Sequence, residues 1–302
     1  MLSIKTPRYL PFIKHPALIN IGASRIDSSD WIEPDNDFKR YYQNKSLQAE
    51  VNKSSVYLAL DESLEAQEEL SALLLKHLTI DHADSYSINK NSLNQESLNL
   101  SKQNLNWPLS TPSSDIEQLW RASLWIQDDI CLLQPYYING RTSAYKLTAG
   151  SVCAPSHWRL KDKIGADFFA LHSPVPGLQS KLQDGIMRLF AKLDSAPIVR
   201  ANWGISVSDT LMRLPEDQQL EESVAADSDL FLRVERQSLR KLPNTGAIVF
   251  TIRVYTYPLE SIKAIDGAVS ALQKSIAAMS QEEYQYKSMR KLEPALNLFF
   301  YN

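Results

Sequence analysis

The sequence is poor in the residues that most often mark recognisable chemistry. Its 302 residues include two cysteines, five histidines and nine glycines. Cys131 and Cys153 are too few to build a disulfide scaffold, a four-cysteine zinc site or a cysteine-ligated iron–sulfur cluster. The few glycines form neither of the common phosphate-binding loops, which removes the main support for P-loop and Rossmann folds. The histidines leave a metal-binding role open, with few candidates.

Neither sign of charge dominates, and no long apolar run is present. Lys and Arg total 32 against 35 for Asp and Glu, so a basic nucleic-acid-binding domain is not favoured. No stretch of 18 apolar residues occurs, which predicts no membrane span. Pro7 and Pro11 interrupt the N-terminus, which lacks the apolar core of a signal peptide. With two cysteines that are expected to be reduced, we expect a cytoplasmic protein that binds neither nucleic acid nor membrane.

Composition divides the chain into three parts. Residues 1–115 hold an aromatic-rich N-terminal arm, an amphipathic helix over 62–79 and a polar stretch over 83–113 that is rich in Asn, Ser and Gln. The polar stretch is typical of an insertion or a long loop. Residues 116–260 are expected to form the core, and residues 261–302 are expected to form helices that flank it.

Five segments of the core have the apolar patterns of strands. These are residues 130–138, 144–153, 197–207, 229–238 and 246–257. Between the second and the third, residues 156–193 carry only helical and loop signals. Two strands, a helical excursion and three strands is the order of a PAS domain. We therefore expect an α+β fold with a PAS-like five-stranded antiparallel sheet, helices over one face and a small-molecule pocket between them.

Charged side chains interrupt two of these predicted strands. Alternation places Arg233 and Glu235 on one face of strand 229–238 and Arg236 on the other. Arg253 lies on strand 246–257. One interpretation is a half-solvated face with cross-strand ion pairs. The other is a pocket in which burial and an arginine tune Glu235, or in which an arginine binds a carboxylate.

The histidines differ in their surroundings. Three fall at positions typical of structural or solvated residues: His15, His77 and His82. His172 follows the apolar residues 168–171, and Pro174 and Pro176 restrict the backbone after it. A neutral imidazole held on an apolar wall suits axial ligation of a heme iron, although a core or capping role is also open. Ligation by Cys153 is an alternative that requires positive surroundings.

The chain resembles a known family in five blocks of sequence. In chain order they are WIQDDICLL, VCAPSHWRLKDKIG, LHSPVPG, VRANWGIS and LFLRVERQSLRKLPNTGAIVFTIRVYTYPL, within about residues 115–260. Together they are similar to the heme-dependent oxidative N-demethylase alpha-subunit-like family. The resemblance implies a PAS-type fold that binds heme b and uses O2 to oxidise a small, dimethylamine-like secondary amine. The products would be the demethylated amine and formaldehyde, with electrons from NADPH through FMN and a 2Fe–2S cluster on partner reductase subunits.

The resemblance also implies roles for residues in these blocks. His172 is expected to be the axial heme ligand, with His157 as the alternative. Glu235 and Arg253 are expected to be catalytic, on the side where oxygen or amine binds. The candidates for contact with heme propionates, or for support around the heme, are Arg200, Asn202, Arg233 and Arg236.

Two other interpretations stay open. The protein could be a PAS-type sensor that binds heme or another small ligand without turnover, because a fold does not fix a function. It could also be a structural subunit without cofactor, with a basic docking surface at Arg233, Arg236, Arg240 and Lys241. The acidic stretch over 215–229 is predicted to be a loop between two strands.

Overall fold

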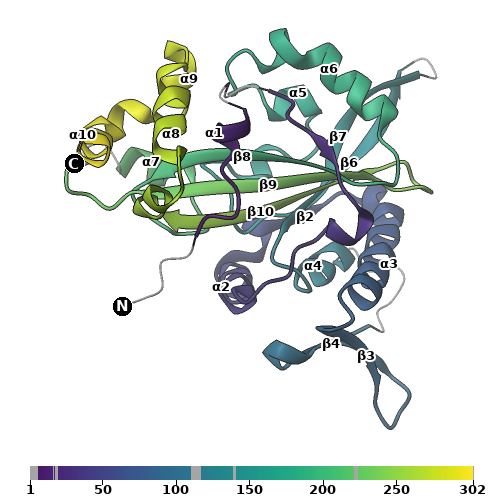
Figure 1. Cartoon of the computed structure of the whole chain (residues 1–302). Coiled ribbons are helices and arrows are strands. Elements are labelled where there is room, and N and C mark those ends of the chain that lie inside the picture. Colours follow the sequence, from purple (N-terminus) through teal and green to yellow (C-terminus); the bar gives the residue numbers. More distant parts are fainter. Residues whose placement is uncertain are drawn as a thin grey trace.

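An antiparallel sheet of seven strands forms the centre of the molecule, in the order β1–β8–β9–β10–β6–β7–β2 (Figure 1). The computed structural model describes residues 6–15, 17, 20–109, 117–138, 141–220 and 224–301. The strands are β1 (Ser24–Arg25), β2 (Tyr57–Ala59), β6 (Asp129–Ile138), β7 (Arg141–Ser151), β8 (Ile198–Ser206), β9 (Phe231–Lys241) and β10 (Ile248–Pro258).

The five predicted strands are the five central strands of this sheet, which confirms the α+β class. Their spatial order is β7–β6–β10–β9–β8. The expected number of five is wrong for the whole sheet, because the N-terminal part of the chain adds β1 beside β8 and β2 beside β7. These edge strands have two and three residues, too few to show an alternation of apolar and polar residues.

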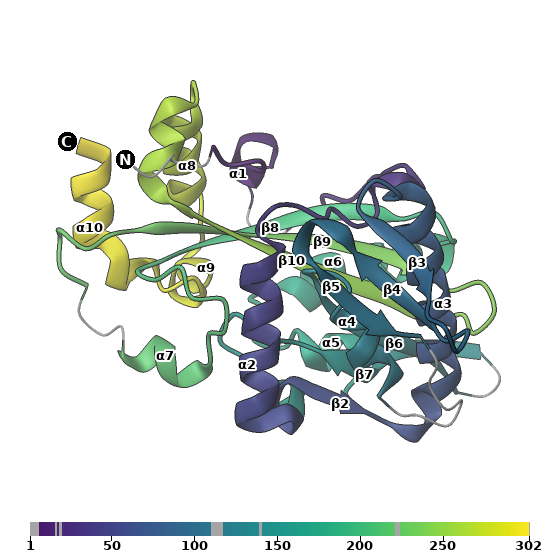
Figure 2. The ribbon, with the colours of Figure 1, turned by 90° about the horizontal axis from the view of Figure 1, so that it is seen from below.

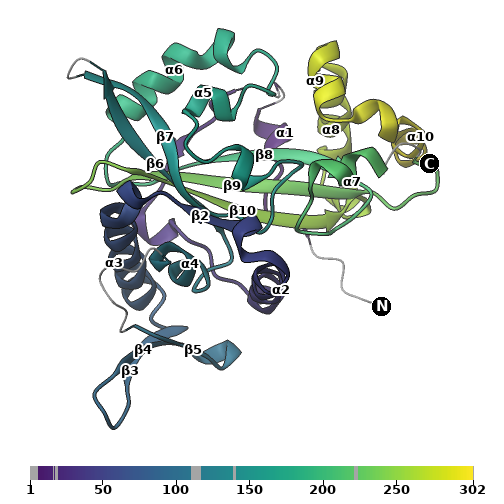
Figure 3. The same cartoon turned by 180° about the vertical axis from the view of Figure 1, so that it is seen from behind.

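Helices cover both faces of the sheet, so the expectation of one covered face is also wrong (Figures 1 and 3). One face carries α5 (Phe168–Leu171) and α6 (Leu178–Lys192) from the segment between β7 and β8. We call it the α6 face. The opposite face carries three helices: α2 (Phe38–Val56), α3 (Leu64–Asp81) and α4 (Gln118–Ser123). We call it the α3 face. No helix in the described part of the chain is long and apolar enough to cross a membrane.

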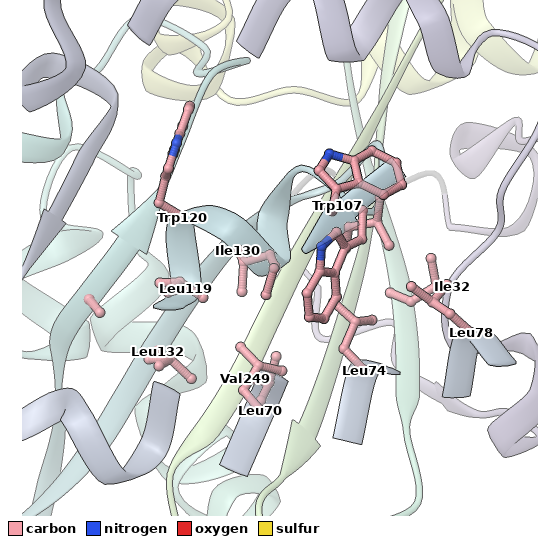
Figure 4. Packing of buried hydrophobic residues seen from close by; sticks show 14 of the residues in the cluster. Ile32, Leu70, Leu74, Leu78, Trp107, Leu119, Trp120, Ile130, Leu132 and Val249 are labelled. Atoms are coloured by element: carbon pink, nitrogen blue, oxygen red, sulfur yellow. The ribbon is translucent and has the colours of Figure 1, made fainter. Parts of the chain in front are cut away.

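Alternate residues of the strands supply a separate core to each face. On the α3 face, Leu70, Leu74 and Leu78 are fully buried and join the cluster that contains Ile130 and Val249 (Figure 4). These leucines belong to the stripe predicted for the helix over 62–79. The strand residues that alternate with these point to the α6 face, where they pack with α6. This second cluster includes Cys131, Leu133, Ile186, Phe190 and Ile248.

The polar stretch over 83–113 is not a long loop where the structure describes it. It forms a second antiparallel sheet from β3 (Tyr86–Lys90), β4 (Glu96–Leu100) and β5 (Leu105–Pro108), which lies in front of the main sheet in the view of Figure 2. Residues 110–113 lie outside the described residues. The sheet forms because Tyr86 pairs with Leu100 and Leu98 with Trp107, and all four side chains are buried.

The C-terminal helices lie at one end of the sheet (Figure 3). They are α8 (Ala268–Ala277), α9 (Gln281–Tyr286) and α10 (Met289–Tyr301), and the short α1 (Pro11–Lys14) lies beside α8. Leu272 and Leu292 are buried in one cluster with Trp203 and Leu232 of the sheet.

The division of the chain at residues 115 and 260 stays a prediction. Within the predicted acidic loop, residues 215–220 form the helix α7 (Pro215–Leu220), whereas residues 221–223 lie outside the described residues.

Acid is expected to lower the stability of the fold through His77, which is only 4% exposed. Burial lowers the pKa of His77 to about 4, although the Asp81 carboxylate, 2.8 Å from Nδ1, opposes this shift. An unfolded histidine has a pKa of about 6.5, so the unfolded chain takes up the proton first as the pH falls. The contribution of neutral His77 to stability is therefore complete above pH 6.5 and is lost toward pH 4.

The His77→Gln variant is expected to lose about 2 kcal/mol less stability than the wild type between pH 7 and pH 5. Urea unfolding at the two pH values measures this difference. Equal pH dependence in both proteins would show that His77 does not control it.

Candidate functional site

Four of the residues predicted for the site lie side by side on the α6 face of β8 and β9. The antiparallel register places Asn202 opposite Glu235, Arg200 opposite Gln237 and Gly204 opposite Arg233. Because each pair shares a face, these strands alone bring Arg200, Asn202, Arg233 and Glu235 together. The sequence could indicate which residues share a strand face, and the register supplies the rest.

Glu235 is held as an anion by donors on three segments. Its Oε1 accepts a hydrogen bond of 2.7 Å from Ser156 Oγ. Its Oε2 accepts from Asn202 Nδ2 at 3.3 Å and from Gln237 Nε2 at 3.0 Å. Burial by itself raises the pKa of the carboxyl, but the Arg233 guanidinium and the hydrogen bonds outweigh it, so the pKa of Glu235 lies below its usual value. Glu235 is therefore ionised at neutral pH.

Arg233 fixes the loops that frame this carboxylate. Its Nε donates to Ser156 Oγ at 2.9 Å, and Nη2 donates to the carbonyl oxygens of Ala154 at 2.7 Å and Leu211 at 3.1 Å. Burial lowers the pKa of Arg233 to about 10, so the guanidinium keeps its charge at neutral pH. Since most of its N–H groups already have acceptors, Arg233 supports Glu235 and the loops more than it offers donors to a ligand.

Arg200 has one N–H group without an acceptor among the described residues. Its Nη1 donates to Gln237 Oε1 and its Nη2 to the carbonyl oxygen of Asn20, both at 3.1 Å. Its Nε is buried and has no acceptor in the described part of the chain. A half-buried cation whose Nε–H is buried and unused fits the carboxylate of a ligand, because the contact would give both groups a partner.

His172 lies on the same side of the sheet, at the C-terminal end of α5. Its Nδ1 is 2.8 Å from the carbonyl oxygen of Phe168, and its ring packs on the Phe168 ring with centroids 4.3 Å apart. Burial lowers the pKa of His172, so the ring is neutral. Because Nδ1 carries the proton donated to that carbonyl, Nε2 keeps the lone pair that an iron would bind.

His157 has a different kind of setting. Its backbone has a φ of 62°, an uncommon value for a residue other than glycine, and its backbone N–H donates to the carbonyl of Arg213 at 2.8 Å. Its Nε2 is buried and has no partner in the described part of the chain. Burial and the charges of Arg213 and Arg233 lower the pKa of His157 to about 4. His157 thus stays the alternative ligand.

The donor set fits a heme better than a metal ion held by side chains alone. Among the described residues there is no group of three or more His, Cys, Asp and Glu that could hold a metal ion. A porphyrin supplies four ligands itself, so one neutral imidazole is enough. Cys153 fits poorly, since it is 1% exposed and burial, followed by the Asp129 charge, raises the pKa of its thiol.

Arg236 and Arg253 lie away from this site. They are paired across β9 and β10 on the α3 face, the face opposite Glu235. Arg236 Nε is 3.3 Å from Glu33 Oε1, and Arg253 Nη2 is 2.8 Å from Asp35 Oδ2. The structure therefore does not bring Arg253 to Glu235. Arg253 is paired with Arg236, the neighbour of Glu235 on β9, and neighbouring residues of a strand point to opposite faces of the sheet.

Sequence reasoning misses two residues of the site. Ser156 lies in a block whose histidine is the more conspicuous candidate, and a lone serine gives no local signal. Lys287 follows α9 and reaches the sheet, where its Nζ donates to Asn202 Oδ1 at 3.2 Å and to the carbonyl of Trp203 at 2.6 Å. Burial lowers the pKa of Lys287 to about 8.

There is open space beside the site at Gly204. A Cβ atom at this position would meet no atom of the described residues within 4 Å, although the opposite residue, Arg233, is buried. Two cavities elsewhere have volumes of about 180 and 440 Å³, and none of the predicted site residues lines either of them. The larger cavity lies between the start of β9 and α10.

Comparison with known families covers far more than the blocks that first indicated a resemblance. The model of a family described as haem-dependent oxidative N-demethylase, alpha subunit-like, matches residues 22–297. The match begins before β1 and ends within α10, so it includes the edge strands, the second sheet and the C-terminal helices. It spans nearly the whole sequence of 302 residues. The chain therefore belongs to the haem-dependent oxidative N-demethylase alpha subunit-like family.

Proposed function

We propose that this chain is the amine-oxidising subunit of an oxidative N-demethylase. His172 would hold the iron of heme b on the α6 face, and a small secondary amine such as dimethylamine would bind at Glu235. The observation that carries the proposal is the ionised carboxylate of Glu235 on the same face as an imidazole whose Nε2 is left for a metal.

The connection between strands supports a PAS-type core around this site. Counted along the chain, the five central strands lie in the order second, first, fifth, fourth, third. The helices α5 and α6 leave β7 and return to β8 over the face that carries Glu235. A ligand between these helices and the sheet would contact His172 on one side and Arg200, with its unused Nε, on the other. A heme propionate would satisfy that donor.

Glu235 binds and orients the substrate. A secondary amine is a cation at neutral pH, so it forms a charge-assisted hydrogen bond with the carboxylate. Ser156 and Asn202 fix the two carboxylate oxygens, so the ion pair would fix the position of the amine nitrogen. The bound heme supplies the activation of O2 and the oxidation of the methyl group. One amine, O2, NADPH and a proton would give the demethylated amine, formaldehyde, water and NADP⁺.

Partner subunits supply the electrons in this proposal. The family name describes an alpha subunit, which implies further subunits. Both cysteines of this chain are free and buried, and two thiols are too few for a cysteine-ligated 2Fe–2S cluster. FMN, the cluster and NADPH would therefore be held by a reductase partner in the cytoplasm.

The Glu235→Gln variant tests this function. Glutamine keeps the shape of the side chain but removes the charge that pairs with the ammonium group. We expect kcat/KM for formaldehyde release from dimethylamine to fall roughly tenfold to a hundredfold while the heme absorption spectrum stays unchanged. The assay uses purified protein with heme and a surrogate reductant.

The matched control is Glu260→Gln, an exposed glutamate paired with Lys263. It is expected to retain the wild-type rate. Turnover of the Glu235→Gln variant at the wild-type rate would contradict the role of Glu235. Heme binding without any turnover by the wild type would favour a sensor instead.

A further inference from the structure

A lysine from the C-terminal segment completes the environment of Glu235. Lys287 directly follows α9, which packs with α8 and α10 at one end of the sheet (Figure 3). Its ammonium group ends at β8, 3.2 Å from Asn202 Oδ1 and 2.6 Å from the carbonyl oxygen of Trp203. Asn202 Nδ2 in turn lies 3.3 Å from Glu235 Oε2. Three side chains from three parts of the sequence thus form one chain of hydrogen bonds.

The direction of each hydrogen bond between Lys287, Asn202 and Glu235 is fixed by the chemistry of the groups. A lysine ammonium group can only donate, and an ionised carboxylate can only accept. The side-chain amide of Asn202 must therefore turn its oxygen to Lys287 and its nitrogen to Glu235. The reverse orientation would place the amide oxygen against the carboxylate and the amide hydrogens against the ammonium group.

We propose that Lys287 is a positioning residue for the amine site, which acts through Asn202 to orient Glu235 and to keep it ionised. This inference rests on the proposed function and adds the C-terminal segment to it. Lys287 does not touch the substrate in this proposal. It sets the direction of the Asn202 amide and adds a positive charge close to the carboxylate.

The Arg233 charge lowers the pKa of Glu235 more than the Lys287 charge does, but among the described residues only Lys287 donates to the side-chain oxygen of Asn202. Arg233 lies on the same strand and already donates to Ser156 and to backbone carbonyls. Arg200 on β8 donates to Gln237 instead of to Glu235. Partial burial and the charge of Glu235 raise the pKa of Tyr286 to about 12, so its ring stays neutral.

The test measures the pKa of the Glu235 carboxyl in the heme-free protein. Carbon NMR of protein with ¹³C-labelled glutamate carboxyls follows the titration, and the Glu235→Gln spectrum assigns the signal. In Lys287→Met we expect the pKa of Glu235 to rise, because a nearby positive charge and the fixed amide are lost. Lys287→Arg keeps the charge and the donors, so it is expected to restore the wild-type pKa.

Lys274→Met is the control, since it removes one exposed charge from α8 in the same C-terminal segment. It is expected to leave the titration unchanged. An unchanged Glu235 pKa in Lys287→Met would overturn the proposal. If that variant does not fold, Lys287→Gln, which keeps a donor but no charge, takes its place with the same criterion.

A second measurement connects the lysine to turnover. The acid limb of kcat/KM for dimethylamine should move to higher pH in Lys287→Met, so that kcat/KM at pH 5 falls roughly twofold to fourfold. On the alkaline side of this limb kcat should stay at the wild-type value. A wild type without turnover but with the expected NMR shift would refute the proposed function alone. An acid limb that does not move would refute the link between Lys287 and the amine.

Discussion

Replacing His172 with alanine is expected to weaken heme binding more than a hundredfold and to abolish the Soret band of the axially ligated protein. The imidazole is the only part of His172 that the iron would use, and its Nδ1 is already held by the Phe168 carbonyl. Loss of that hydrogen bond removes about 1 kcal/mol of stability. The variant should therefore fold, so a missing Soret band would report the missing ligand.

Titration of the heme-free variant with hemin, followed by visible absorption, measures the effect. His157→Ala is the matched comparison and is expected to bind heme as the wild type does. Free imidazole added to His172→Ala should restore part of the absorption, because a small ligand can occupy the space left by the side chain. If instead His157→Ala loses the band and His172→Ala keeps it, the axial ligand is His157.

The strands and their faces could be predicted from local patterns. Runs of β-branched, aromatic and leucine residues between turn signals are enough to define the five central strands. Alternation along residues 231–236 correctly separates Arg233 and Glu235 from Arg236, because a strand has a period of two wherever it lies in a sheet. His172 can likewise be singled out from the sequence, because the apolar residues and prolines that mark it lie within a few positions of it.

The rest depends on contacts between distant segments. The edge strands β1 and β2 exist because an edge of the sheet accepts them, and their own few residues carry no signal. The second sheet depends on burying Tyr86, Leu98 and Trp107, whose polar neighbours dominate the composition. Lys287 meets Asn202 across 85 positions of sequence. No single sequence indicates such a pair.

What covers each strand face is also a long-range property, and it determines which groups contact Arg253. Alternation could place this arginine on a face but could not show which segment packs on it. In the structure, the N-terminal segment supplies Asp35 and Tyr41 there, and Arg253 is 0% exposed. The guanidinium lies 3.8 Å from the centre of the Tyr41 ring and 4.8 Å from that of Tyr255. From these contacts we predict that Arg253 stabilises the fold from the α3 face.

Arg253→Met is accordingly expected to lower the free energy of unfolding by about 3–5 kcal/mol, because it leaves the charges that pair with this arginine uncompensated. Asp35 loses its ion pair of 2.8 Å. Asp128 is 1% exposed, and neither of its carboxylate oxygens has a hydrogen-bond partner in the described part of the chain. Burial raises the pKa of Asp128, and Arg253 is the foremost group that opposes this shift.

Urea unfolding at pH 7 measures the loss, and Arg25→Met is the control because its ion pair with Asp194 is more than half exposed. A surface pair of this kind contributes about 0–1 kcal/mol, so the control should unfold almost as the wild type does. In buffer without urea, at a temperature where Arg253→Met is folded, the heme spectrum and the KM for dimethylamine of this variant should match those of the wild type. A raised KM at unchanged stability would instead place Arg253 at the amine, and the two faces of the sheet would then have to contribute to one site.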